Sequence, residues 1–233
     1  MLTLPSMHDE CIGVVISPQT LLCSWLQPYK PGYPSILKAC AVTQLGDGVV
    51  NADRIFSPTL LAKHIRSFIA AYGITRSYVL FAVDSPGMYT EFLRFSSHHN
   101  LHSIKPPRST IGYSYYLYPD GEQAVFLYAG MPCTLLAQYV FLAMSINLNL
   151  VAIVPHFMAY LALYKHLYGT AFRRAQLACD MQKHNNRLED FFAYDDMKRL
   201  VYTGAIPYAF DHNVQLLALV TGLHIMGTSY EKD

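Results

Sequence analysis

Residues 48–85, GVVNADRIFSPTLLAKHIRSFIAAYGITRSYVLFAVDS, decide the fold class of this chain. Their middle part predicts a helix, because Ser57 is a good N-cap, Pro58 suits the first helical position and Gly73 can end the helix. Apolar residues recur at helical spacing and predict one buried stripe, formed by Leu60, Leu61, Ile65, Phe68, Ile69 and Tyr72. The apolar run at 78–83 predicts a strand covered on both faces. A helix followed directly by a buried strand favours an α/β layered fold.

The flanking sequence extends this pattern of strands and helices. The other expected strands are 12–17, 20–26, 36–45, 87–95, 112–118, 122–129, 150–154 and 200–203. The other expected helices are 132–146, 155–168, 188–197 and 211–226. Residues 172–179 fit either a strand or a helical turn, and Gly227 is expected to end the last helix. Three strands, a helix and a strand in this order are the opening of a ribonuclease-H-like fold.

The composition restricts the classes of function. Of the 233 residues, 52% are hydrophobic and 14% are charged, whereas ordinary soluble domains carry roughly 25% charged residues. We therefore expect either unusually extensive burial or a surface that a partner covers. The 17 basic and 16 acidic residues nearly balance, which argues against nucleic acid as a partner. The first ten residues are too short and acidic for a signal peptide, and no clean apolar stretch of about 18 residues predicts a membrane span.

The sequence offers no specific catalytic or metal-binding motif. The five cysteines are odd in number and include no CxxC pair, so we expect small buried hydrophobic residues in a reducing compartment. His98, His99 and His102 lie close together, but no acidic residue or cysteine nearby completes a metal site, and a solvated loop is favoured. Asp84 and Ser85 follow a buried strand, where active sites often lie in α/β folds. A turn cap is the favoured interpretation of this pair.

Four segments resemble the pilus-assembly protein family of PilM and HofM. Members are actin-like proteins of bacterial type IV pilus and DNA-uptake machines, related to the cytoplasmic part of the type II secretion protein GspL. The similar segments are IGVVI at 12–16, the block at 48–83, the stretch at 123–167, and VYTG at 201–204 with the helix that follows from residue 213. No single motif among them is specific, and the resemblance depends on their order and spacing.

This resemblance implies a ribonuclease-H-like, actin-like α/β fold with a small inserted α+β subdomain and a truncated second half. Residues 1–86 would form the ribonuclease-H-like subdomain and residues 87–154 the inserted one. Residues 155–233 would form the shortened second actin-like part with the C-terminal helix.

The departures from the family pattern concern the nucleotide loops. Actin-like enzymes carry an Asp in the first strand and a Gly after it, where this chain has Val15 and Ser17, followed by Pro18. A valine cannot bind a hydrated cation, and a proline lacks the N–H that would contact phosphate. Of the glycine pair of the adenosine loop only Gly204 is kept. We therefore expect a pseudo-ATPase with no catalytic residue, no bound metal and no cofactor.

The resemblance further implies a docking role. It predicts a cytoplasmic scaffold, peripheral to the inner membrane, that binds the short cytoplasmic tail of a bitopic inner-membrane protein, with a secretion or pilus ATPase as a further partner. By position, the binding groove is expected between the strand at 87–95 and the hairpin at 112–129. The expected partner-binding residues are Phe92, Arg94, Tyr115 and Leu117. Apolar groups of the tail would contact the aromatic rings, and Arg94 would meet a polar or acidic group.

Two alternatives stay open from the sequence. The chain could be an active actin-like ATPase with divergent phosphate loops, which nucleotide binding would reveal. It could also be a peripheral membrane protein unrelated to pili that uses the apolar helix at 131–146, which liposome flotation would favour.

Overall fold

The computed structural model describes residues 10–27, 35–51, 54–75, 77–85, 88–96, 110–120, 123–169, 173–185, 187–192, 201–203 and 214–229. The strands are β1 Glu10–Ile16, β2 Thr20–Gln27, β3 Ser35–Gln44, β4 Ser77–Val83, β5 Tyr89–Ser96, β6 Thr110–Asp120, β7 Gln123–Pro132, β8 Asn149–Pro155 and β9 Val201–Thr203. The helices are α1 Pro58–Ala71, α2 Cys133–Ser145, α3 His156–Tyr168, α4 Arg174–Lys183, the 3-10 helix η3 Leu188–Phe191 and α6 Val214–Ser229.

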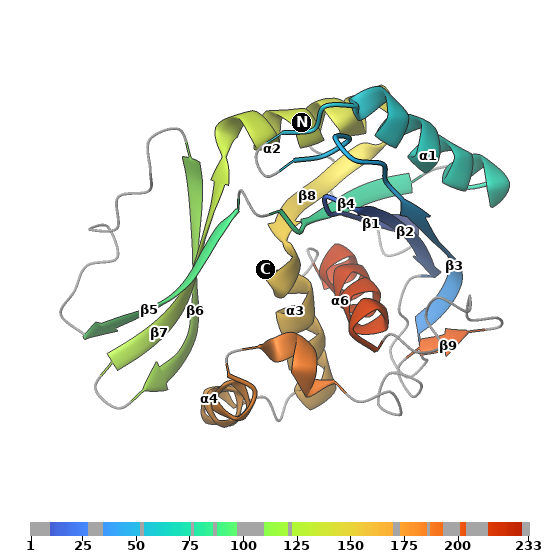
Figure 1. Cartoon of the computed structure of the whole chain (residues 1–233). Coiled ribbons are helices and arrows are strands. Elements are labelled where there is room, and N and C mark those ends of the chain that lie inside the picture. Colours follow the sequence, from blue (N-terminus) through green and yellow to red (C-terminus); the bar gives the residue numbers. More distant parts are fainter. Residues whose placement is uncertain are drawn as a thin grey trace.

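A six-stranded mixed sheet in the order β8-β4-β1-β2-β3-β9 forms the centre of the molecule. β2 pairs antiparallel with both β1 and β3, while the β1–β4, β4–β8 and β3–β9 pairs are parallel. Figure 1 shows α1 and α2 on one face of this sheet and α3 and α6 on the other. The predicted α/β fold with a ribonuclease-H-like strand order is confirmed.

The residues of β1 show why helices cover both faces. Successive side chains of a strand point to opposite faces. Ile12, Val14 and Ile16 pack in the core that includes α1 and α2, whereas Cys11 and Val15 pack in the core that includes α3 and α6. Because both sets are apolar and buried, β1 can only lie between two helical layers.

Helix α1 follows the sequence prediction in its centre and departs from it at both ends. Its buried residues are Leu61, Ala62, Ile65 and Phe68. Leu60 and Tyr72, which the predicted stripe included, are exposed. Leu60 precedes the fully buried Leu61, and successive side chains of a helix point in different directions around its axis. Tyr72 is the C-cap, after the last helical residue. Ser57 occupies the N-cap position, but its side chain makes no capping hydrogen bond. Gly73 has a φ of 64°, the left-handed conformation expected after a helix.

A second sheet of three antiparallel strands, β5-β7-β6, stands beside the main sheet (Figure 1). β5 pairs with β7 along its whole length, from Tyr89 opposite Gly130 to Ser96 opposite Gln123. The predicted position of the groove, between the strand at 87–95 and the hairpin, is therefore wrong, because backbone hydrogen bonds join β5 directly to β7. The main sheet also takes β8 and β9 from the two later predicted segments. The main sheet thus extends across the boundaries that were expected between the subdomains, at 86/87 and 154/155.

The C-terminal part corrects two further expectations. The ambiguous segment at 172–179 contributes to the helix α4, and of the helix expected at 188–197 the described part is the short η3. Helix α6 continues past Gly227 to Ser229. Every residue from 217 to 226 is buried, so packing against the rest of the fold stabilises the helix beyond its intrinsic stop signal.

Candidate docking site

The small sheet places the four expected partner-binding residues on its two outer strands, β5 and β6, with β7 between them. Phe92 in β5 and Tyr115 in β6 both pair with Leu127 in the central strand β7. Arg94 lies two residues beyond Phe92. Leu117 is the extra residue at a register shift between Tyr116 and Tyr118, as in a β-bulge. The role of these residues in partner binding stays a prediction.

Phe92 also has a contact within the molecule that the sequence does not show. Its ring lies 5.8 Å from the ring of Phe157 in α3, with an angle of 81° between the planes. Leu127, which pairs with Phe92, is buried in the core that includes α3 and α4. Phe92 is half-buried and Arg94 is exposed. Helix α3 thus covers part of the Phe92 side chain, whereas Arg94 is exposed.

The turn between β1 and β2 lies where the family resemblance predicts the first phosphate loop. The N–H of Ser17 donates to the carbonyl of Thr20 at 2.9 Å, and the N–H of Thr20 donates to Oγ of Ser17 at 3.0 Å. The hydroxyls of Ser17 and Thr20 are 2.7 Å apart, and Pro18 has no N–H to offer. Val15 is a buried core residue. These groups of the turn are already bonded within the hairpin. Gly204, predicted to remain from the adenosine loop, lies outside the described residues.

Asp84 and Ser85 lie where β4 ends and α3 begins. Oδ1 of Asp84 is 3.8 Å from Nδ1 of His156, the first residue of α3. The side chain of Asp84 is 56% exposed, whereas Ser85 is buried. A carboxylate beside a helix N-terminus is stabilised by the helix dipole, which agrees with the structural role expected for this pair.

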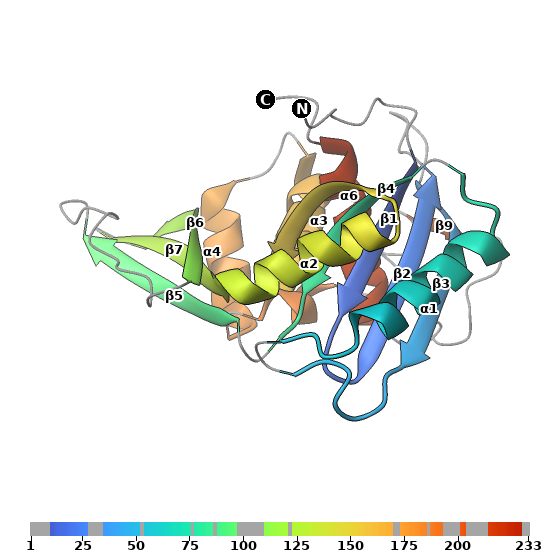
Figure 2. The same cartoon turned by 90° about the horizontal axis from the view of Figure 1, so that it is seen from above.

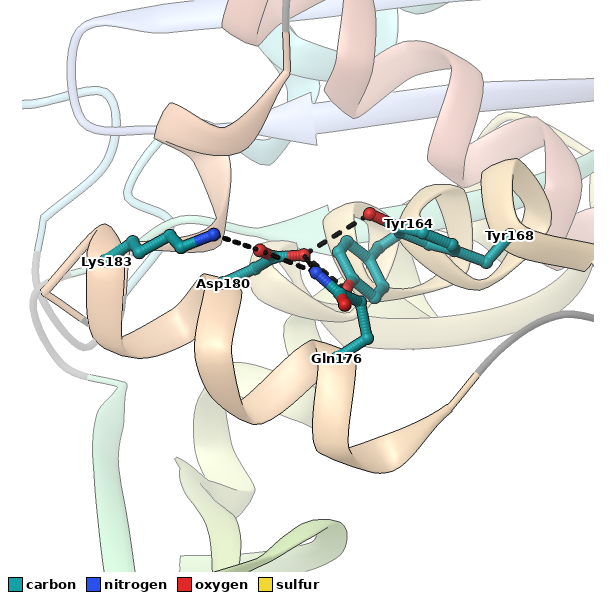
Figure 3. Close-up of polar contacts among 5 residues, drawn as sticks. All are labelled: Tyr164, Tyr168, Gln176, Asp180 and Lys183. Atoms are coloured by element: carbon teal, nitrogen blue, oxygen red, sulfur yellow. Dashed lines mark hydrogen bonds and ion pairs between the residues drawn. The ribbon is translucent and has the colours of Figure 1, made fainter.

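A cluster of polar side chains around the buried Asp180 joins α3 to α4 (Figure 3), and it was not among the sites predicted from the sequence. The carboxylate of Asp180 accepts hydrogen bonds from the hydroxyls of Tyr164 at 2.7 Å and Tyr168 at 3.3 Å. Nε2 of Gln176 lies 3.1 Å from both carboxylate oxygens. Nζ of Lys183 is 3.6 Å from Oδ1. Tyrosines four residues apart in α3, and Gln176 four residues before Asp180 in α4, are the signal that could have indicated this cluster.

The electrostatics of this cluster indicate an anchor and not a site of proton transfer. Burial alone would raise the pKa of Asp180, but the donors Tyr164, Gln176, Lys183 and Tyr168 together hold it below its ordinary value. Burial, and then the Asp180 carboxylate, raise the pKa of Tyr164. Asp180 is thus a buried carboxylate that is ionised at neutral pH and hydrogen-bonded on both oxygens. Its contacts hold α4 against α3.

The cysteines separate into two groups. Cys11, Cys23 and Cys40 are buried as expected, and burial raises the pKa of Cys11 and of Cys23 to about 12, so these thiols are unreactive. Cys133 and Cys179 are exposed, contrary to the expectation, because each lies on the solvent side of a helix. Within the described ranges no three metal-ligating side chains come together. His98, His99 and His102 lie outside those ranges.

A surface pocket of about 600 Å³ opens at the C-terminal ends of α1 and α2. Its lining includes Arg66, Tyr78, Asn147 and Asn149. Tyr78 and Asn149 lie at the N-terminal ends of the parallel strands β4 and β8. Ligands of open α/β sheets usually bind at the opposite, carboxyl ends of the strands, so we do not place the candidate site there.

Comparison with known proteins shows the fold. No family model and no curated protein matches the sequence. Among solved structures, the chain is similar to the "PilM-PilN type IV pilus biogenesis complex", with a TM-score of 0.55 and 18% identity over 68% of this chain and 51% of that chain. This chain therefore spans about half the length of that relative. It is also similar to the cytoplasmic domain of EpsL, an inner membrane component of the type II secretion system of Vibrio cholerae, with a TM-score of 0.40 and 11% identity over 65% of this chain and 57% of that chain.

The predicted likeness to PilM and to the actin-like fold is thus confirmed at the level of structure. None of the helices in the described ranges is both long and apolar enough to cross a lipid bilayer.

Proposed function

We propose that this protein is a non-catalytic scaffold of a type IV pilus or type II secretion assembly. In this role it lies in the cytoplasm against the inner membrane and binds the cytoplasmic tail of a bitopic membrane protein. A pilus or secretion ATPase is a further candidate partner. The observation that carries the proposal is the fold shared with PilM, whose structure was solved as a complex with PilN.

The β1–β2 turn supports the non-catalytic part of the proposal. A phosphate loop needs free backbone N–H groups that converge on the ligand. In this turn the N–H groups of Ser17 and Thr20 are bonded within the hairpin, and Pro18 has none. An active ATPase with divergent loops would have to bind triphosphate elsewhere.

The small sheet supports the docking part. An apolar ring beside an exposed cation, as in Phe92 and Arg94, can bind an extended segment that offers apolar side chains and one acidic group. Because β5 is an edge strand of its sheet, its backbone can also pair with an added strand.

A pull-down with the purified bitopic protein tests the proposal. We expect wild-type protein to retain it, and Phe92→Ala and Tyr115→Ala to lose most of the retained partner. Glu91→Gln, next to Phe92 in β5 and exposed, is the matched control. Equal retention by wild type and both alanine variants would place the docking site elsewhere, and no retention by the wild type would contradict the proposed function.

A further inference from the structure

Exposed large hydrophobic side chains in the described part of the chain gather on one helical layer. Helices α1 and α2 lie side by side over one face of the main sheet (Figures 1 and 2). Apart from Val42 in β3, the exposed large hydrophobic residues are Phe56, Leu60, Tyr72, Val140, Phe141 and Met144. Phe141 is 60% exposed and Met144 73% exposed, so most of each side chain is in water.

Helix α2 has no polar side to turn to the solvent. Its sequence, CTLLAQYVFLAMS, contains no charged residue. Leu135, Tyr139, Leu142 and Ala143 are buried on the side that faces the sheet, while Val140, Phe141 and Met144 are exposed on the other. A helix that is apolar all round is normally buried all round. The exposed side of α2 thus has the apolar composition of a surface that is normally in contact with another apolar surface.

The charged side chains that α1 and α2 themselves carry are all basic. Neither α1 nor α2 contains an acidic residue, and Lys63 and Arg66 are exposed on α1. Arg54, just before α1, lies over the ring of Phe56 at 5.3 Å. The guanidinium of Arg66 donates to the carbonyl of Ser145 at the end of α2. This hydrogen bond holds the cation close to α2, which carries the exposed apolar side chains.

We propose that the outer side of the α1–α2 layer contacts the surface of an anionic lipid bilayer. Phe141 and Met144 enter the boundary between headgroups and acyl chains, and Arg54, Lys63 and Arg66 lie near lipid phosphates. Exposed apolar side chains flanked by cations, with no acidic residue in either helix, are complementary to such a surface. A second copy of the chain fits less well, because each copy brings the same cations and neither helix brings a carboxylate to meet them. The inference does not depend on the proposed function, since it needs no protein partner.

Co-sedimentation of the full chain with vesicles tests this inference. One set of vesicles contains phosphatidylglycerol and phosphatidylcholine, and the other contains phosphatidylcholine alone. We expect wild-type protein to sediment with the anionic vesicles, less so at high salt, and not with the neutral ones. The double variant Phe141→Ser/Met144→Ser and the single variant Lys63→Glu should each bind severalfold less.

Two matched variants keep the test specific. Val42→Ser removes an exposed hydrophobic side chain outside the layer, and Arg173→Glu reverses an exposed charge at the start of α4. Both should sediment like the wild type. Phe141→Ser/Met144→Ser and Lys63→Glu should keep the wild-type melting temperature, because these side chains are exposed. Absence of wild-type binding, or equal binding to both vesicle types by all variants, would overturn the inference. A dimer in light scattering that the double variant abolishes, without lipid binding, would assign the layer to a second copy and also overturn it.

Discussion

Gly222 in α6 lies directly against the main chain of Ala159 in α3. A Cβ atom at residue 222 would overlap the carbonyl group of Ala159. Both residues are buried, Ala159 in the first turn of α3 and Gly222 near the middle of α6, and the two helices pack on the same face of the main sheet (Figure 1). The close crossing of α3 and α6 therefore depends on the absence of a side chain at this position.

Gly222→Ala should destabilise the protein by about 2–4 kcal/mol, because backbone atoms cannot move aside without separating the helices. Urea unfolding measures this loss. Gly46→Ala is the matched control, since a Cβ at residue 46 meets nothing within 4 Å. If Gly222→Ala unfolds at the same urea concentration as the control, the close α3–α6 crossing is wrong.

The Asp180 cluster predicts unequal effects of two neighbouring substitutions. Asp180→Asn should cost about 2 kcal/mol or more, because an amide N–H₂ replaces an acceptor that faces Tyr164 and Gln176. Lys183→Ala should cost less than about 1 kcal/mol, because the lysine side chain is 68% exposed. Urea unfolding compares the two, and hydrogen exchange should show faster opening of α4 in Asp180→Asn. Equal costs would mean that Asp180 does not anchor the helix.

His224 in α6 predicts a loss of stability in mild acid. Burial, and then the nearby His166, lower the pKa of His224 from 6.5 to about 4. The unfolded chain therefore binds a proton at this histidine at a higher pH than the native protein does. The stability that comes from keeping His224 neutral is fully present above pH 6.5. It is lost as the pH falls toward 4, which lowers the free energy of unfolding by about 3 kcal/mol at most.

The variant His224→Gln should flatten the fall in unfolding free energy between pH 6.5 and 4. Urea titrations at several pH values would measure it, with His64→Gln in α1 as the control. Parallel curves for wild type and His224→Gln would show that His224 is not buried in its neutral form.

The engaged β1–β2 turn predicts that Mg-ATP does not stabilise the protein. A ligand that binds only the native state stabilises it by RT ln(1 + L/Kd), where L is the free ligand concentration, so the melting temperature rises with the ligand concentration. With the N–H groups of Ser17 and Thr20 already bonded, we expect no shift at millimolar Mg-ATP in differential scanning fluorimetry. A concentration-dependent rise would favour the alternative of an active ATPase.

Local sequence patterns were sufficient for most elements of the fold. The alternation in β1 and the helical spacing in α1 are read within one element, and each predicts which side is buried. Predictions failed where a distant contact decided the outcome. Leu60 and Tyr72 fit the helical period of α1, but the tertiary packing leaves both exposed. Gly227 is a good stop signal, but the packing of α6 overrides it.

The candidate site was harder to predict for the same reason. The contact between Phe92 and Phe157 joins β5 to α3, across three strands and a helix of intervening sequence. Pairing of β5 with β7 replaced the expected groove with a continuous sheet. The Asp180 cluster needs α4 to lie on α3, which no periodicity within either helix specifies. Residue types and spacing thus indicate which side chains are suited to a functional site, while non-local packing decides which of them come into contact.

The central claim is that this actin-like frame serves as a docking platform without using nucleotide. Isothermal titration of the full chain with a synthetic peptide of the bitopic protein's cytoplasmic tail, with and without Mg-ATP, tests it most directly. We predict saturable binding of the peptide with the same affinity in both titrations, and weaker binding by Phe92→Ala. No peptide binding, or binding that requires Mg-ATP, would contradict the claim.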